Sequence, residues 1–313
     1  LKKINFKKAL ICAQSNVAVL GLYLKLLDTT FDKDVALCIA PSKIPEGIVV
    51  TSNETNKKII CSTISGKNGP LLKHLDFDAI FVDEAAQISE AIFWTLITSE
   101  VETIVMAGDI HQLRWQSSEP RASELNHDRS IMERLMVNLN YPSTLLTTEF
   151  RMCPKILEYP NKTFYNNKLV NSKTYQGTYK CFKVNDSECE KIGTSFVNKN
   201  EARVIKDLIE NVDKNKTVVI CPYTAQCRHI LSKQLDVQVH TVDSYQGREA
   251  NTIILNMVRT GNECGFWNDY RRLVVALTRA CETLIIVGSF DWASDPLKSL
   301  CDDAISRNVI EEV

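Results

Sequence analysis

The sequence predicts an α/β fold with two mostly parallel sheets, each covered by helices on both faces. Short apolar runs rich in β-branched residues alternate with amphipathic segments along the 313 residues. Runs this apolar and this short are typical of parallel strands that are buried on both faces. They form two sets, separated by a polar, weakly periodic stretch at 116–128. These observations favour two domains of the same class.

Nine apolar runs are the expected strands. They are 9–13, 58–63, 79–85, 103–109, 143–148, 217–223, 237–243, 251–258 and 283–289. The amphipathic segments between them are the expected helices, at 16–27, 89–98, 129–139, 155–165, 199–212 and 224–235. Residues 171–198 are rich in Lys, Thr, Asn and Gly and alternate loosely, so we expect a hairpin or surface excursion there. The expected domains are 1–142 and 143–313, with a boundary near 140–142.

Composition excludes some classes of protein. The net charge of −1 gives no overall basic field, so any nucleic-acid surface must be local. None of the eleven cysteines forms a C-x-x-C pair, which argues against a zinc ribbon. Several lie inside apolar runs, as reduced cysteines do, so we expect a reducing intracellular compartment. Without a long apolar run of about 18 residues or a signal-peptide core, we expect no membrane segment.

The stretch FVDEAAQISEA (81–91) places two acids at the end of a buried strand. Ligands of parallel sheets collect beyond the carboxyl ends of the strands. Such a pair is the Walker B arrangement, in which Asp83 would hold Mg²⁺ and Glu84 could take a proton from an attacking water. The motif is short, and a solvated acidic pair at a strand end remains the alternative.

Two further stretches provide groups suited to phosphate chemistry. TIVMAGDIHQLRW (103–115) places Gln112 three residues after Asp109, where a neutral amide could sense a phosphate and position water without competing for the metal. Arg151 lies between an expected strand and an expected helix that begins with proline. Its planar, permanently charged group suits a phosphate whose charge is being redistributed. The alternatives are an exposed loop amide for Gln112 and a surface salt bridge for Arg151.

Taken in order, these stretches resemble the motifs of superfamily 1 helicases. ALICAQSN (9–16) is similar to motif Ia, FVDEAAQ (81–87) to motif II and MAGDIHQL (106–113) to motif III. In the same way TEFRMCP (148–154) is similar to motif IV, HTVDSYQGREANTIIL (240–255) to motif V and RRLVVALTRA (271–280) to motif VI. Together they resemble the up-frameshift helicases of RNA surveillance and the nidovirus replicase helicases. Each motif alone is weak, but six in the correct order at plausible spacing are specific.

The resemblance implies a fold, an activity and a set of residues. The fold would be two tandem RecA-like domains, and the activity ATP-driven movement along nucleic acid in the 5′-to-3′ direction. ATP and Mg²⁺ would be the cofactors, with Asp83 as the metal ligand and Glu84 as the general base. Gln112 would contact the γ-phosphate, and Arg151 and Arg279 would be arginine fingers. Gly247 and Glu249 would touch the phosphate and ribose of the nucleotide.

The partner implied by the resemblance is single-stranded or duplex nucleic acid, RNA or DNA, held through its backbone. Hydroxyl and amide groups at strand ends occupy the matching positions, which are Ser15, Asn16, Ser62, Thr63, Tyr223, Thr224, Thr241 and Ser244. Such contacts need little net positive charge. The alternative is helix capping, because a Ser or Thr at a strand end is often an N-cap.

One motif of the family is missing. No G-x-x-x-x-G-K-[ST] loop occurs in the 313 residues, and the one Gly-Lys pair, in SGKN (65–68), lacks the other required residues. The family places this loop ahead of motif Ia. We therefore expect either that the parent protein continues upstream of Leu1, or that this is an ATPase-deficient helicase-like module that binds nucleic acid or a partner protein. An NTPase that remodels complexes without separating duplexes also stays open.

Overall fold

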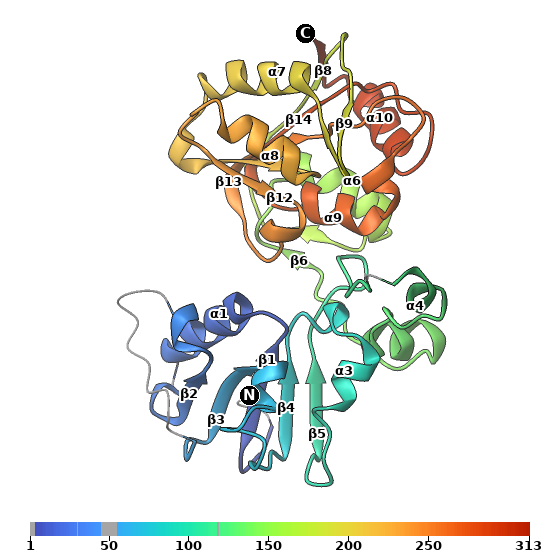
Figure 1. The fold of residues 1–313 in the computed structure, drawn as a ribbon. Helices are drawn as coiled ribbons and strands as arrows, with labels where there is room; N and C mark the ends of the chain where they lie inside the picture. Colours follow the sequence, from blue (N-terminus) through green and yellow to red (C-terminus); the bar gives the residue numbers. More distant parts are fainter. Residues whose placement is uncertain (1–3, 30, 45–54, 118) are drawn as a thin grey trace. The chain divides into compact units, whose positions relative to one another are not determined.

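The computed structural model describes residues 4–29, 31–44, 55–117 and 119–313. The chain divides into two compact units, Leu1–Ser143 and Thr144–Val313. Each unit has its own sheet and its own core (Figure 1).

The first unit is built on a five-stranded parallel sheet in the order β2-β3-β1-β4-β5. Its strands are β1 Ala9–Ala13, β2 Val35–Cys38, β3 Ile59–Thr63, β4 Ala79–Val82 and β5 Thr103–Met106. Leu10 on the central strand lies opposite Ile60 and Ile80. All three pack into one core, while Ile11 and Val19 belong to another, so the inner strands are buried on both faces.

Helices of the first unit are mostly short. They are α1 Asn16–Leu27, α2 Ile64–Lys67, α3 Glu90–Trp94, α4 Pro120–Glu124 and α5 Ile131–Glu133, with 3₁₀ turns at Asp32–Asp34, Pro41–Lys43 and Ala85–Gln87. α5 continues into a π-helical turn, Arg134–Asn138, so the helix expected at 129–139 is present as these two pieces.

The second unit is built on a six-stranded parallel sheet in the order β12-β11-β13-β14-β8-β15. Its strands are β8 Thr178–Lys183, β11 Thr217–Cys221, β12 Gln238–Thr241, β13 Ala250–Asn256, β14 Ala280–Gly288 and β15 Ile310–Glu312. Two smaller pairs lie outside it. β6 Thr148–Glu149 pairs with β7 Val170–Asn171, and β9 Glu190–Ile192 forms a hairpin with β10 Ser195–Val197.

Helices of the second unit cover this sheet (Figure 1). They are α6 Pro154–Phe164, α7 Lys199–Ile209, α8 Thr224–Leu231, α9 Tyr270–Leu277 and α10 Leu297–Ser306, with 3₁₀ turns at Lys214–Lys216, Asp243–Tyr245 and Gly265–Asn268. α7 is amphipathic, and Ala202, Ile205 and Ile209 bury one side of it. No helix in the described ranges is both long enough and apolar enough to cross a membrane.

The structure confirms the α/β class with two largely parallel sheets, and two local predictions hold only in part. The segment 171–198 does contain a hairpin, yet its first part, Thr178–Lys183, is an inner strand between β14 and β15. The strand expected at 143–148 is reduced to Thr148 paired with Val170. Leu145 and Leu146 ahead of it are exposed.

Candidate functional site

Asp83 and Glu84 directly follow β4, at the carboxyl edge of the first sheet. The backbone N–H of Asp83 donates to the carbonyl of Cys12 at 2.8 Å, which ties the start of this loop to β1. Glu84 adopts left-handed backbone angles, with φ of 52°, and its carboxylate accepts a hydrogen bond from Nε2 of Gln87 at 2.9 Å. Both acids are partly exposed, so solvent reaches them.

The loop after β5 is joined to this acidic loop. The N–H of Ala107 donates to Val82, and the N–H of Ala85 donates back to Ala107, both at 2.8 Å. Gly108 lies so close that a Cβ atom there would be 2.9 Å from the backbone nitrogen of Ala85 and 3.0 Å from that of Ala86. Only glycine permits this approach without displacing one loop, so the two loops form one unit at the sheet edge.

Gln112 belongs to the second of these loops. Its Nε2 donates to Oδ2 of Asp109 at 3.0 Å, and Oδ1 of Asp109 accepts the N–H of His111 at 2.9 Å. Asp109 therefore orients the amide and holds the turn that carries it. Gln112 lies on the same edge as Asp83 and Glu84 and is partly exposed.

Asp83 is the expected ligand for Mg²⁺. Within the described parts of the chain, no three His, Cys, Asp or Glu side chains are grouped so that they could hold a metal ion alone. Magnesium bound with a nucleotide usually takes one or two protein carboxylates, several waters and phosphate oxygens. A single partly exposed carboxylate at a strand end fits that donor set.

The hydroxyl residues of the first unit take different positions. Ser15 caps α1, accepting the N–H of Ala18 at 3.1 Å, and Asn16 is the first residue of that helix. Thr63 caps α2, accepting the N–H of Gly66 at 3.0 Å. For Ser15 and Thr63 the capping alternative is therefore observed, although Ser15 is also exposed to solvent.

Ser62 is not at the surface. It is 0% exposed, and its hydroxyl donates to the carbonyl of Cys38 at 2.8 Å, joining β3 to β2. Gly66 packs directly over this hydroxyl, which explains why the side chain is shielded. Lys67 of the SGKN stretch is also buried, with its Nζ 5.6 Å from the centre of the Phe77 ring. Neither side chain is placed to contact a ligand from solvent.

In the second unit, two guanidinium groups meet around Thr278. Arg151 follows β6, and its Nη1 donates to the carbonyl of Thr278 at 3.2 Å. Arg279 precedes β14, and its Nη2 donates to the Thr278 hydroxyl at 2.7 Å. The remaining nitrogens of Arg279 donate to the carbonyls of Val275 at 2.9 Å and Arg248 at 3.3 Å. The structure thus brings together the two arginines expected to act on the nucleotide.

The two arginines differ in their exposure. Arg279 is 2% exposed, and its guanidinium braces the backbone around it. Arg151 is partly exposed, and its Nε lies 2.5 Å from Oε2 of Glu249. In this arrangement Glu249, expected to contact the nucleotide, neutralises an arginine instead. Gly247, two residues earlier, is exposed and has φ of 76°, and a Cβ atom added there would have nothing within 4 Å.

The sequence alone did not single out Thr278. Its carbonyl and hydroxyl hold both arginines, and its own hydroxyl donates to the carbonyl of Val274 at 2.8 Å. A Thr-Arg pair at the end of an apolar helix is the available signal, since a helix end offers unpaired carbonyls to neighbouring donors.

The remaining predicted residues lie at the carboxyl edge of the second sheet, whereas Arg279 and Glu249 lie at its amino edge. Tyr223 and Thr224 follow β11, Thr241 is the last residue of β12 and Ser244 comes after it, so all four are at the carboxyl edge. The Tyr223 hydroxyl accepts the N–H of Phe266 at 3.2 Å, and burial raises the pKa of Tyr223. The hydroxyls of Thr241 and Ser244 are 3.0 Å apart and hold a tight turn. Thr224 is exposed at the start of α8.

The second unit therefore separates two groups of residues. Glu249 and Arg279 precede their strands and lie at the amino edge of the sheet, while Tyr223 follows β11 and Thr241 ends β12 at the carboxyl edge. The segment 242–249 runs from one edge to the other. Sequence reasoning placed the motifs in order but not on opposite edges.

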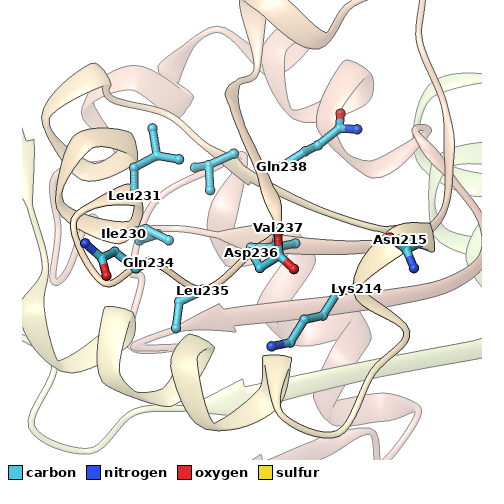
Figure 2. Close-up of a pocket in the computed structure, with 10 residues that line it drawn as sticks. Lys214, Asn215, Ile230, Leu231, Gln234, Leu235, Asp236, Val237 and Gln238 are labelled. Atoms are coloured by element: carbon cyan, nitrogen blue, oxygen red, sulfur yellow. The ribbon is translucent and has the colours of Figure 1, made fainter.

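Each unit has one cavity of note, and only the first borders a predicted site residue. One, of about 370 Å³, lies beside α1 in the first unit and is lined by Ile11, Phe81, Val105 and Asp83 among others. The other, of about 420 Å³, lies between α8 and the start of β12 and is lined by residues that include Lys214, Leu235 and Gln238 (Figure 2). No predicted site residue lines the second cavity, so we assign it no role. The first borders the expected metal ligand.

Known families and proteins match most of the chain. Two family definitions described as AAA domain match residues 42–114 and 127–291. Helicase sen1 of Schizosaccharomyces pombe is 30% identical over 291 residues, covering 81% of this chain and 17% of the relative. ATP-dependent helicase upf1 of the same organism is 31% identical over 265 residues, covering 74% and 28% respectively. Regulator of nonsense transcripts 1 of Dictyostelium discoideum is 31% identical over 289 residues, covering 81% and 22%.

Solved structures agree on the fold. The crystal structure of Arterivirus nonstructural protein 10, a helicase, has a TM-score of 0.54 at 18% identity and covers 96% of this chain and 56% of its own. Its complex with DNA gives 0.53 at 18% identity, covering 94% and 56%. This chain thus spans less than a third of the three named relatives and 56% of the viral helicase. With the AAA-domain match over more than half of its residues, the chain belongs to the up-frameshift-like group of superfamily 1 helicases.

Proposed function

We propose that this chain is the ATP-driven motor of a nucleic-acid helicase or translocase. One observation carries the proposal. The first unit presents a carboxylate pair and an oriented amide at one sheet edge, and the second unit presents two guanidinium groups that share Thr278. Phosphoryl transfer needs a metal ligand, a base and cations for the developing charge, and these two sets supply them.

In this mechanism Asp83 would hold Mg²⁺, and Glu84 would accept the proton of the attacking water. Gln112 contacts the γ-phosphate. Arg151 and Arg279 stabilise the charge that spreads over the transferred group, which in related reactions contributes about 10³-fold or more. Mg²⁺ would supply charge neutralisation and orient the phosphates.

Both arginines must change partners to take part. Arg151 would leave Glu249, an exposed ion pair of the kind that contributes little to stability. Arg279 would leave the carbonyls that it holds in the buried interior, which costs more because those acceptors lose their donors. We therefore assign the first response to nucleotide to Arg151.

The proposed strand contacts combine residues of both units. They are Ser15, Asn16, Thr63, Tyr223, Thr224, Thr241 and Ser244. Ser62 is left out because its hydroxyl is buried. Hydroxyls and main-chain groups of this kind grip the backbone of a strand without reading its sequence. The relatives named as ATP-dependent helicases and the DNA complex of the viral helicase support nucleic acid as the partner. We propose 5′-to-3′ movement from the family resemblance.

The motor needs a triphosphate-binding loop, which these 313 residues do not contain. Parallel sheets are normally covered on both faces. In the first sheet, Val105 on β5 is 37% exposed, and the 370 Å³ cavity beside it reaches Asp83. A triphosphate-binding loop, with the helix that follows it, would fit over this face.

All eleven cysteines are free, which fits the reducing intracellular compartment that we propose for the protein.

The test uses a version of the protein that includes a triphosphate-binding loop. Glu84→Gln should abolish duplex unwinding and ATP turnover while leaving the affinity for ATP intact, because the amide cannot accept the proton. Glu100→Gln, a change of an exposed acid in the same unit, is the matched control and should unwind normally. Unwinding that survives in Glu84→Gln would rule out the assigned base.

The absent loop also favours a second candidate, a binding module without ATPase activity. This module would hold a strand equally well with and without MgATP. The motor instead predicts that strand affinity changes with the nucleotide state, so an affinity measured with ADP, with a non-hydrolysable triphosphate and with no nucleotide separates the two.

A further inference from the structure

A buried polar cluster lies at the carboxyl edge of the second sheet. Its members are Ser187, Asn198, Glu201, Gln226 and Asn256, and the last four are each 0% exposed. They come from four separate segments: the loop before β9, the start of α7, the first turn of α8 and the end of β13. We call them the Glu201 cluster.

Glu201 is the centre of this cluster. Its Oε1 accepts hydrogen bonds from the Ser187 hydroxyl at 2.8 Å and from Nδ2 of Asn198 at 3.0 Å. Its Oε2 accepts from Nδ2 of Asn256 and from the backbone N–H of Val258 at 2.7 Å. A glutamine would turn an NH₂ group toward at least one of these donors, whereas both oxygens of a carboxylate can accept hydrogen bonds.

The first structure fixed by Glu201 is the turn after β13. Val258 has φ of 66°, a conformation that a β-branched residue adopts only under constraint. Its N–H is held by Glu201, and its carbonyl accepts from Nδ2 of Asn198 at 3.2 Å. The next residue, Arg259, places its guanidinium 4.3 Å from the centre of the Phe196 ring.

The second structure fixed by the cluster is the start of α8. Nε2 of Gln226 donates to Oδ1 of Asn256 at 2.6 Å and to the carbonyl of Asn198 at 3.1 Å. Its Oε1 accepts the N–H of Asn198 at 2.8 Å. Gln226 comes just after Tyr223 and Thr224 in the chain. Its hydrogen bonds to Asn198 and Asn256 therefore fix the position of the helix turn that carries these two residues. Phe196 then contacts the Tyr223 ring, with 5.1 Å between centres.

We propose that Glu201 is a positioning residue for strand binding, acting through Gln226 and Val258 to hold Tyr223 and Thr224 in one geometry. This inference rests on the proposed strand contacts of the second unit. An apolar core would keep α7 on the sheet equally well, since buried ionisable groups seldom add stability. A fully satisfied polar network instead specifies one arrangement of the four segments that it joins.

The experiment measures the affinity of the 313-residue chain for a fluorescent single-stranded oligonucleotide, as RNA and as DNA, well below the thermal midpoint of each variant. Glu201→Gln should weaken binding by about tenfold, the scale expected when buried donors lose their acceptor. Glu210→Gln, at the exposed end of the same helix, should bind as wild type. Ile209→Val, a core change on α7 outside the cluster, should lower the thermal midpoint without weakening binding.

A second pair of variants covers the case in which Glu201→Gln does not fold. Ser187→Ala removes one donor at a half-buried position and should weaken binding by about threefold, at the lower end of the same scale. Ser187→Thr keeps the hydroxyl and should restore wild-type affinity. Wild-type affinity in both Glu201→Gln and Ser187→Ala would overturn the inference, and equal losses in Ile209→Val would reduce the role of Glu201 to stability. A wild-type chain that binds no strand would instead contradict the proposed function.

Discussion

Replacing Gly108 with alanine should slow ATP turnover as well as destabilise the fold. The added Cβ atom would lie 2.9 Å from the nitrogen of Ala85 and 3.0 Å from that of Ala86, where ordinary contacts begin near 3.4 Å. The acidic loop must therefore move by about 0.5 Å, the difference between 3.4 and 2.9 Å. Glu84 directly precedes this contact, and its left-handed backbone leaves it little freedom to compensate.

The size of the effect follows from that displacement. A misplacement of about 1 Å can cost about 10²-fold in rate, so half of it should cost about tenfold in kcat. Overpacking of this kind costs about 1–3 kcal/mol of stability. The assay is steady-state ATP hydrolysis by the protein that includes a triphosphate-binding loop, together with thermal denaturation.

The matched control is Gly21→Ala in α1. Nothing lies within 4 Å of a Cβ atom at that position, and alanine is the better helix former by up to about 1 kcal/mol. Its kcat should equal that of the wild type, and its thermal midpoint should be unchanged or higher. An unaltered kcat in Gly108→Ala would refute the claim that the two loops must remain in contact for catalysis.

Three further outcomes are expected. Ser62→Ala should lower the thermal midpoint, because the Cys38 carbonyl loses its donor, and should leave strand affinity unchanged in an anisotropy titration. Arg279→Met should cost about 1–3 kcal/mol for each buried acceptor left without a donor, whereas Arg151→Met should change the thermal midpoint little; chemical denaturation compares them. Burial raises the pKa of Glu201 from its ordinary 4.5 to about 8. The folded state then binds more protons than the unfolded state between these values, so the free energy of unfolding should fall as pH rises from 4.5 to 8. Glu201→Gln should flatten that slope, which urea unfolding across the window measures.

The fold class could be predicted because most strands and helices are marked by a pattern in their own local sequence. β1 and α1 have the bounds expected from their apolar pattern, and α1 begins where Ser15 provides a cap. β8 could not be predicted in the same way. Its sequence, TYKCFK, contains two lysines that suggest an exposed segment, yet Lys180 and Lys183 pair with Glu311 and Glu312 at 2.9 and 2.8 Å. Those partners lie near the other end of the sequence, where no local pattern reveals them.

The sequence could suggest which residues form the candidate site, and that assignment stays a prediction, but it could not predict their geometry. Motif order identified Asp83, Glu84 and both arginines, and the structure brings the arginines together around Thr278. The burial of Arg279 could not be foreseen, because it depends on carbonyls contributed by two different segments. Ser62 shows the same limit, since a serine at a strand end has the same local sequence whether its hydroxyl meets solvent or a neighbouring strand.

The segment 242–249 has a consequence for how the second unit would transmit work. It connects the carboxyl edge, where the proposed strand contacts lie, to the amino edge, where Glu249 and Arg279 lie. It contains a single glycine, Gly247, with φ of 76°. A segment this short can absorb little displacement. A movement of Glu249 would therefore either move Thr241 or be absorbed by backbone rotation at that glycine. The backbone flexibility of Gly247 would then determine how much of the movement from each ATP hydrolysed becomes movement along the nucleic acid strand.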